Sequence, residues 1–251
     1  MSDRQPFFVT ATLGAACLVL ASCGGGSDTT PAPTPAADEC NLAGSVFLVA
    51  GNTAQMKNNV YDDDGTSIAM TQVSDFVING GASLKGSGGL IEIAQTTKGI
   101  SGIDSGTTAR INFYVNYSAS EEKIFGFTNA NTAKGMPVST TYSFSPTPSW
   151  PINPTQGTPY TNTYTQTTEI MGAPSSQTVF EVRTYSTEQI TTLAGTFAAC
   201  KVRYDSTRNG ATITSYSWKV GSGRLKGHLL KSVTAAGVRT VEATSLTVNG
   251  S

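Results

Sequence analysis

The sequence predicts an all-β fold, an antiparallel and curved sheet that forms an open or half barrel or a sandwich. Three observations favour this class. Ser and Thr make up about a quarter of the 251 residues, and Thr, Tyr and Val suit strands better than helices. Segments of alternating apolar and polar residues recur along the chain, separated by Gly-containing turns. From Asn41 onward, no apolar stripe of helical period extends beyond two turns.

The expected strands follow one another closely. The clearest alternation places Ile111, Phe113, Val115 and Tyr117 on one face of a strand. Other segments of strand length lie at 45–50, 67–73, 89–95, 177–185, 201–204 and 238–244. Turn signals lie at 64–65, 79–81, 86–89, 209–210 and 237. Short strands at this spacing are typical of antiparallel sandwiches and barrels.

One hairpin allows its register to be predicted. A two-residue turn at Asn209-Gly210 would pair Val202 with Ser217, which separates Val202 from the face of Trp218. A shift of one residue pairs Val202 with Trp218 and gathers the apolar side chains on one face. We therefore expect the shifted register.

The charge content argues against a nucleic-acid partner. The chain has 16 basic and 17 acidic residues, a net charge of −1, and only 13% charged residues. It has no cluster of Lys and Arg of the kind that binds phosphate backbones.

The N-terminus is typical of a secretory signal. Arg4 precedes an apolar stretch at 7–20, which is shorter than the roughly 20 apolar residues that span a bilayer. The stretch ends in Leu20-Ala21-Ser22-Cys23, which resembles the lipobox of bacterial lipoproteins. The resemblance implies removal of residues 1–22, a diacylglycerol on the Cys23 thiol and an acyl chain on its amine, with no other cofactor. The alternative is an ordinary cleaved signal with Cys23 near the cut.

The lipobox resemblance also implies a location and a domain organisation. Gly24, by the sorting rule of such lipoproteins, implies export to the outer membrane, with the membrane as partner through the lipid. We expect the domain to face the periplasm. Residues 23–38 are rich in Gly, Pro and Thr and are expected to form a tether, followed by a single all-β domain at 39–251.

The remaining cysteines predict a disulfide. Cys17 would leave with the signal and Cys23 would carry lipid, so Cys40 and Cys200 form an even pair in an oxidising compartment. Two buried thiols are the alternative. A metal site is not expected, because two Cys and one His do not complete a ligand set.

Two further features have ordinary structural interpretations. Asp62-Asp63-Asp64-Gly65 resembles the start of a calcium loop, but Val73 stands where the bidentate Glu is needed, which favours a hairpin turn. His228 is the sole His, and we expect it at a surface or sheet edge. The chain has no G-x-S-x-G motif, so we expect no catalytic residues and no enzyme.

Aromatic residues gather around a proline-rich segment at 145–160, which is expected to be a long loop or a seam between subdomains. They can pack onto the core, or form a surface that binds protein or glycan. These residues are Tyr142, Phe144, Trp150, Tyr160 and Tyr164.

The C-terminal half carries a second resemblance. The segment 194–202, AGTFAACKV, is followed by Trp218 and by Gly221-Ser222-Gly223-Arg224-Leu225-Lys226. This pattern resembles uncharacterised periplasmic lipoproteins similar to the half-barrel lipoprotein-localisation factors. Residues 222–225 depart from the pattern, so no ligand pocket is carried over. We expect a lipid-anchored, non-catalytic envelope protein whose β domain holds an apolar ligand such as a lipid, or, as an alternative, binds protein or glycan through the aromatic segment 142–164.

Overall fold

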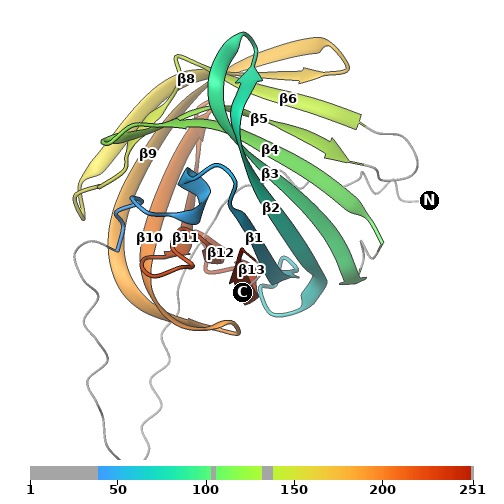
Figure 1. Cartoon of the computed structure of the whole chain (residues 1–251), viewed down its shortest axis with the longest axis vertical. Coiled ribbons are helices and arrows are strands. Elements are labelled where there is room, and N and C mark those ends of the chain that lie inside the picture. Colours follow the sequence, from blue (N-terminus) through green and yellow to red (C-terminus); the bar gives the residue numbers. More distant parts are fainter. Residues whose placement is uncertain (1–38, 103–105, 132–137, 250–251) are drawn as a thin grey trace, which may run out of the picture.

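The computed structural model describes residues 39–102, 106–131 and 138–249, and nearly all of its regular structure is β (Figure 1). A single 3-10 turn, η1 (Val46–Leu48), precedes the strands. The strands are β1 (Thr53–Tyr61), β2 (Ile68–Leu84), β3 (Ser87–Gly102), β4 (Thr108–Tyr117), β5 (Glu121–Asn131), β6 (Val138–Ser145), β7 (Ser149–Pro151), β8 (Pro159–Ile170), β9 (Ala173–Thr192), β10 (Gly195–Arg208), β11 (Ala211–Val220), β12 (Leu229–Thr234) and β13 (Arg239–Val248). Among the described residues, no helix is long and apolar enough to cross a membrane.

The strands form a closed antiparallel barrel. The sheet order runs β4-β3-β2-β1-β13-β12-β11-β10-β9-β8-β6-β5, and pairing of β4 with β5 closes the ring. The short β7 pairs with β5 beyond the end of β6. The predicted all-β antiparallel class is confirmed, but the barrel is closed rather than open or half. Closure pairs the edge strands that an open sheet would leave exposed.

The segment between residue 39 and β1 crosses the barrel interior. Cys40 is disulfide-bonded to Cys200 on β10, whereas Phe47 packs against Phe76 on β2 at 5.4 Å between ring centroids. Four strands separate β2 from β10 in one direction around the ring and six in the other. A segment that contacts nearly opposite walls passes through the interior, so Phe76 and Cys200 point inward. The expected strand at 45–50 is therefore wrong, because this apolar run fills one end of the barrel.

The predicted hairpin register is also wrong. Asn209 and Gly210, both with positive φ, form a two-residue turn, and Val202 pairs with Ser217. Val202 packs with Cys40, Cys200, Tyr185 and Tyr204 on the inward face. The opposite face is buried as well, in a second cluster formed by Ala199, Trp218, Val220, Leu230 and Val233. Because β10 and β11 bury both faces, no shift was needed to cover Trp218.

The tip of the β2–β3 hairpin packs against the outside of the barrel. Leu84 and Leu90 cluster with Tyr114, and a Cβ at Gly126 would collide with Leu84 and with the backbone of Tyr142. Gly126 therefore allows close approach of this hairpin to β5 and β6. Lys85, at the tip, forms an ion pair with Glu169 at the end of β8.

The acidic run at 62–64 forms the β1–β2 turn, as expected. The Asp64 carboxylate accepts hydrogen bonds from the Ser67 hydroxyl and from the backbone N–H groups of Thr66 and Ser67. These bonds, with that from Ser67 Oγ first, hold the pKa of Asp64 well below its usual range.

Candidate functional site

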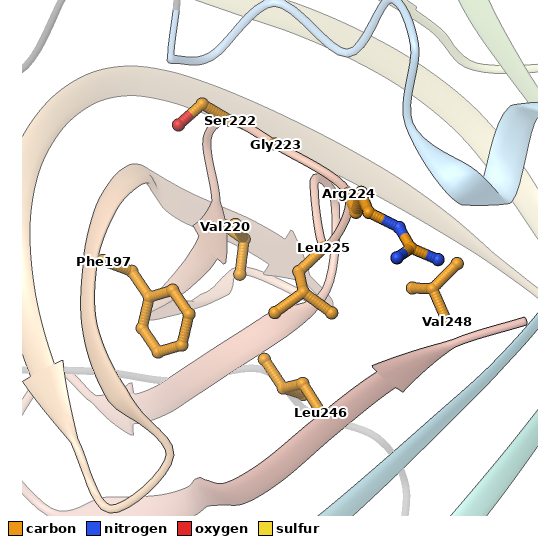
Figure 2. A pocket seen from close by; sticks show the side chains of 8 residues that line it. All are labelled: Phe197, Val220, Ser222, Gly223, Arg224, Leu225, Leu246 and Val248. Atoms are coloured by element: carbon orange, nitrogen blue, oxygen red, sulfur yellow. The ribbon is translucent and has the colours of Figure 1, made fainter. Parts of the chain in front are cut away.

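An apolar groove lies where the β9–β10 hairpin meets β13 (Figure 2). Its volume is about 440 Å³, within the range of roughly 300–1,000 Å³ that is usual for small-molecule sites. Arg224 is the one charged residue among those that line it. The lining residues are Phe197, Val220, Ser222, Gly223, Arg224, Leu225, Leu246 and Val248.

Unequal strand lengths create the groove. Val220, the last residue of β11, pairs with Ala199, so the hairpin formed by β9 and β10 continues past the end of β11. This overhanging tip curls toward the C-terminal strands (Figure 1), and Ile190 and Phe197 pack against the cluster that contains Val220. Phe197 therefore faces Leu246 across the space that the shorter β11 and β12 leave (Figure 2).

The β11–β12 connection forms the third side of the groove. The Gly221 N–H bonds the Ala198 carbonyl at 2.9 Å, and the Gly227 N–H bonds the Val220 carbonyl at 2.8 Å. A Cβ at Gly221 would collide with Glu39, and a Cβ at Gly227 would collide with Ser45. Both glycines thus let the N-terminal segment lie directly against this connection.

The start of the described chain therefore lies beside the groove. Glu39 contacts Gly221, and the next residue, Ser222, lines the groove. Leu225 links the two regions, because it packs both against the Val220 cluster and against the cluster of Val46, Ala54 and Val248.

Arg224 is the polar element of the groove. Its guanidinium lies beside Val248, at one margin of the apolar lining (Figure 2). The combination of five apolar side chains and one cation suits an amphipathic ligand with an apolar chain better than a uniformly polar one. The sequence did not reveal these lining residues, although the glycines at 221 and 223 indicated a tight bend there.

The predicted disulfide between Cys40 and Cys200 is present, with a Cα–Cα distance of 4.7 Å. It joins residues 160 positions apart and attaches the N-terminal segment to the inner face of β10. Cys23, the predicted lipidation site, lies outside the described residues.

The predicted aromatic residues lie on strands rather than on a loop. Tyr142 and Phe144 lie on β6, Trp150 on β7, and Tyr160 and Tyr164 on β8, and β6 pairs directly with β8. The strand registers place all five on the same inward face as Phe76. The proline-rich segment is consequently no seam between subdomains.

Three of these aromatics belong to a longer row across the inner wall. Phe113 on β4 and Phe127 on β5 lie 5.8 Å apart between ring centroids, and Phe127 stacks on Tyr142 at 4.2 Å. Phe144 continues the row to Tyr164 at 5.1 Å. Tyr164 is buried, whereas the other four side chains are half-buried, so solvent reaches part of this inward face. The alternation at 111–117 indicated that Phe113 shares its face with apolar neighbours on the same strand. It could not indicate that rings from other strands continue this face as a row.

Trp150 belongs to a buried polar cluster that Tyr164 connects to this row, whereas Tyr160 lies beside the disulfide. Trp150 is 1% exposed, and the Arg183 guanidinium lies 3.9 Å from its ring centroid. Arg183 pairs with Glu181 at 2.7 Å, and Glu181 accepts a hydrogen bond from the Tyr164 hydroxyl. Burial and the neighbouring Glu181 carboxylate raise the pKa of Tyr164. Tyr160 packs edge-on against Tyr185, beside the disulfide.

His228 is buried, contrary to the expected surface or edge position. It is 1% exposed and lies between Phe47 and Phe76, at 5.1 and 6.4 Å between ring centroids. Its Nε2 has no hydrogen-bond partner among the described residues, and burial lowers its pKa to about 4. Activation of a serine nucleophile requires a hydrogen bond to a histidine nitrogen, and the described residues supply none to His228 Nε2. Within 39–102, 106–131 and 138–249, no three His, Cys, Asp or Glu side chains are grouped to hold a metal.

Comparisons with known proteins give likenesses among solved structures alone. No protein-family model matches the sequence, and no curated protein matches it. Among solved structures, the chain is similar to a Bacteroides fragilis protein provisionally described as exported, with a YMCC-like fold. Their identity is 12% and the TM-score 0.42, over 81% of this chain and 99% of that chain. It is also similar to a Parabacteroides distasonis protein provisionally described as a lipoprotein, at 16% identity and a TM-score of 0.38, over 81% and 99%. At these TM-scores neither likeness carries a functional inference.

Proposed function

We propose that this protein is a lipid-anchored, non-catalytic component of the bacterial outer membrane, on its periplasmic face, whose β domain binds the acyl chain of a lipid. The observation that carries the proposal is the apolar groove between Phe197 and Leu246, with Arg224 at its margin. An acyl chain would occupy the apolar lining, and an acidic headgroup would lie near the guanidinium.

The lipobox-like Leu20-Ala21-Ser22-Cys23 supports the anchored location. Glu39, the first described residue, lies beside the groove and therefore at the same end of the barrel. A lipid on Cys23 would therefore hold this end of the barrel closest to the membrane surface, where acyl ligands are available.

Native mass spectrometry of residues 24–251, exported with an ordinary cleavable signal, tests ligand binding. We expect an additional lipid-sized mass that denaturation releases. Leu246→Arg should abolish it by placing a charge inside the groove, whereas the matched control Ile213→Arg, at a residue 53% exposed on β11, should retain it. A bare protein mass from the unsubstituted domain, with or without added fatty acid, would contradict acyl binding.

Anchoring has its own test. The full chain should yield a mature N-terminal peptide that begins at Cys23 and carries diacylglycerol and an acyl chain, and Cys23→Ser should abolish that modification. A mature N-terminus elsewhere, without lipid, would contradict the anchor while leaving the groove unaffected.

A second candidate function is glycan binding at the aromatic row of the inner wall. It is favoured by the half-buried rings of Phe113, Phe127, Tyr142 and Phe144, which lie among polar residues such as Gln95 on the same face. Sugars stack on aromatic faces and use neighbouring amides for hydrogen bonds. Calorimetry with envelope polysaccharide fragments should then show binding that Tyr142→Ala weakens and Phe180→Ala, at an exposed residue of β9, does not.

A further inference from the structure

We propose that, while the protein is in water, the groove holds an acyl chain attached to its own Cys23. This inference rests on the proposed function, because it requires both a lipidated Cys23 and an acyl-binding groove. The first ligand of the groove is then an acyl chain of the same molecule. This chain leaves the groove for the bilayer when the protein reaches its membrane.

The position of residue 39 makes this contact possible. Glu39 lies against Gly221, and the residues on either side of that glycine, Val220 and Ser222, line the groove. Cys23 lies 16 positions before Glu39 (39 − 23). At about 3.3–3.6 Å per extended residue, this length reaches roughly 55 Å, far more than the return to an adjacent groove requires.

Attachment also favours this ligand over competitors. A ligand joined by a short linker has an effective concentration in the millimolar range, whereas free lipid monomers in water are scarce. Each acyl CH₂ removed from water contributes about 0.8 kcal/mol, so a chain that is not in a bilayer gains from any apolar site that it can reach.

The size and lining of the groove suggest how much lipid it covers. Its volume of about 440 Å³ is near the lower end of the range for small-molecule sites, so we expect one chain rather than the full set on Cys23. Phe197 on β10, Leu225 on the β11–β12 connection and Leu246 on β13 would contact the chain, since they line the groove from three sides.

Photo-cross-linking tests the proposal on the full lipidated protein. Phe197→p-benzoylphenylalanine places a reactive ketone in the groove, and the matched control places the same group at Phe180, which is 43% exposed on β9. After dilution from detergent, illumination should join the peptide containing position 197 to the lipid on the Cys23 peptide, at least about tenfold more than position 180. In a mixture of isotopically heavy and light protein, the joined peptides should carry the same label.

Each other outcome is decisive. Cross-links from position 197 to added palmitate in the unlipidated 24–251 chain, without cross-links to Cys23 in the lipidated protein, would overturn this inference and leave the proposed function standing. Mixed heavy and light pairs would show that the chain belongs to a second copy and would also overturn it. If position 197 cross-links to no lipid in either form, and native mass spectrometry of the unsubstituted 24–251 chain shows no palmitate, the acyl-binding function itself fails.

Discussion

Strands β10 and β11 differ from β6 and β8 in how many of their faces are covered. In β10 and β11, Val202 is buried on the inward face, while Ala199 and Trp218 are buried on the other. In β8, the inward Tyr164 is buried but the opposite side chains, such as Thr163 and Thr165, are exposed. On β6, even the inward Tyr142 and Phe144 remain half-buried. The first pair of strands forms the packing centre of the domain, and the second forms a wall whose inner surface remains accessible.

This comparison predicts different costs for removing aromatic side chains. Trp218 is 2% exposed and packs against Val220 and Leu230, so Trp218→Ala should lower the free energy of unfolding by about 3–5 kcal/mol. Urea denaturation of the 24–251 chain measures this. A loss below about 1 kcal/mol would mean that the cluster around Trp218, on the face opposite to Val202, does not act as a second hydrophobic core.

The inward face of β10 can be tested through its disulfide. Replacing both Cys40 and Cys200 by Ser should lower the free energy of unfolding by about 2–5 kcal/mol, because the bond closes a long loop and anchors the N-terminal segment. Thiol reduction of the unsubstituted protein should give the same loss, and the double variant should be insensitive to reduction. An unchanged urea midpoint in both cases would contradict this role.

The end of the barrel filled by the N-terminal segment should be sensitive to acid. The unfolded His228 has an ordinary pKa near 6.5, whereas burial lowers the folded value to about 4. The unfolded state therefore binds a proton first, so stability is greatest above pH 6.5 and falls as the pH falls toward 4, by up to about 3 kcal/mol. Unfolding of His228→Phe at pH 7 and pH 4 should show a smaller difference than that of the unsubstituted protein. An equal difference would mean that other groups cause the acid sensitivity.

The smallest effect on stability is expected at the inner wall. Phe127→Ala removes a half-buried ring, and we expect it to lower the free energy of unfolding by about 1–2 kcal/mol, less than Trp218→Ala. The ratio of the two losses, measured under identical conditions, tests the comparison directly. A loss at Phe127 as large as that at Trp218 would indicate that the inner wall is a closed core.

The sequence alone determined much of the local structure of this protein. Alternation located β3, β4, β9 and β13, the Asn209-Gly210 turn was recognised from its residue types, and cysteine counting identified the Cys40–Cys200 bond. These features depend on residues close together in the chain or on a small set of reactive groups. They can therefore be predicted without knowledge of the fold.

Only the tertiary structure decided which faces are covered. Periodicity shows that Val202 and Tyr204 share a face, but not that Cys40 packs on that face while the β9–β10 tip covers the other. The burial of His228 and the run of rings from Phe113 to Tyr164 arise in the same way, from strands and segments distant in the sequence. The groove itself exists because β11 ends before its neighbour β10, and the contacts that span the resulting gap form only when the barrel closes.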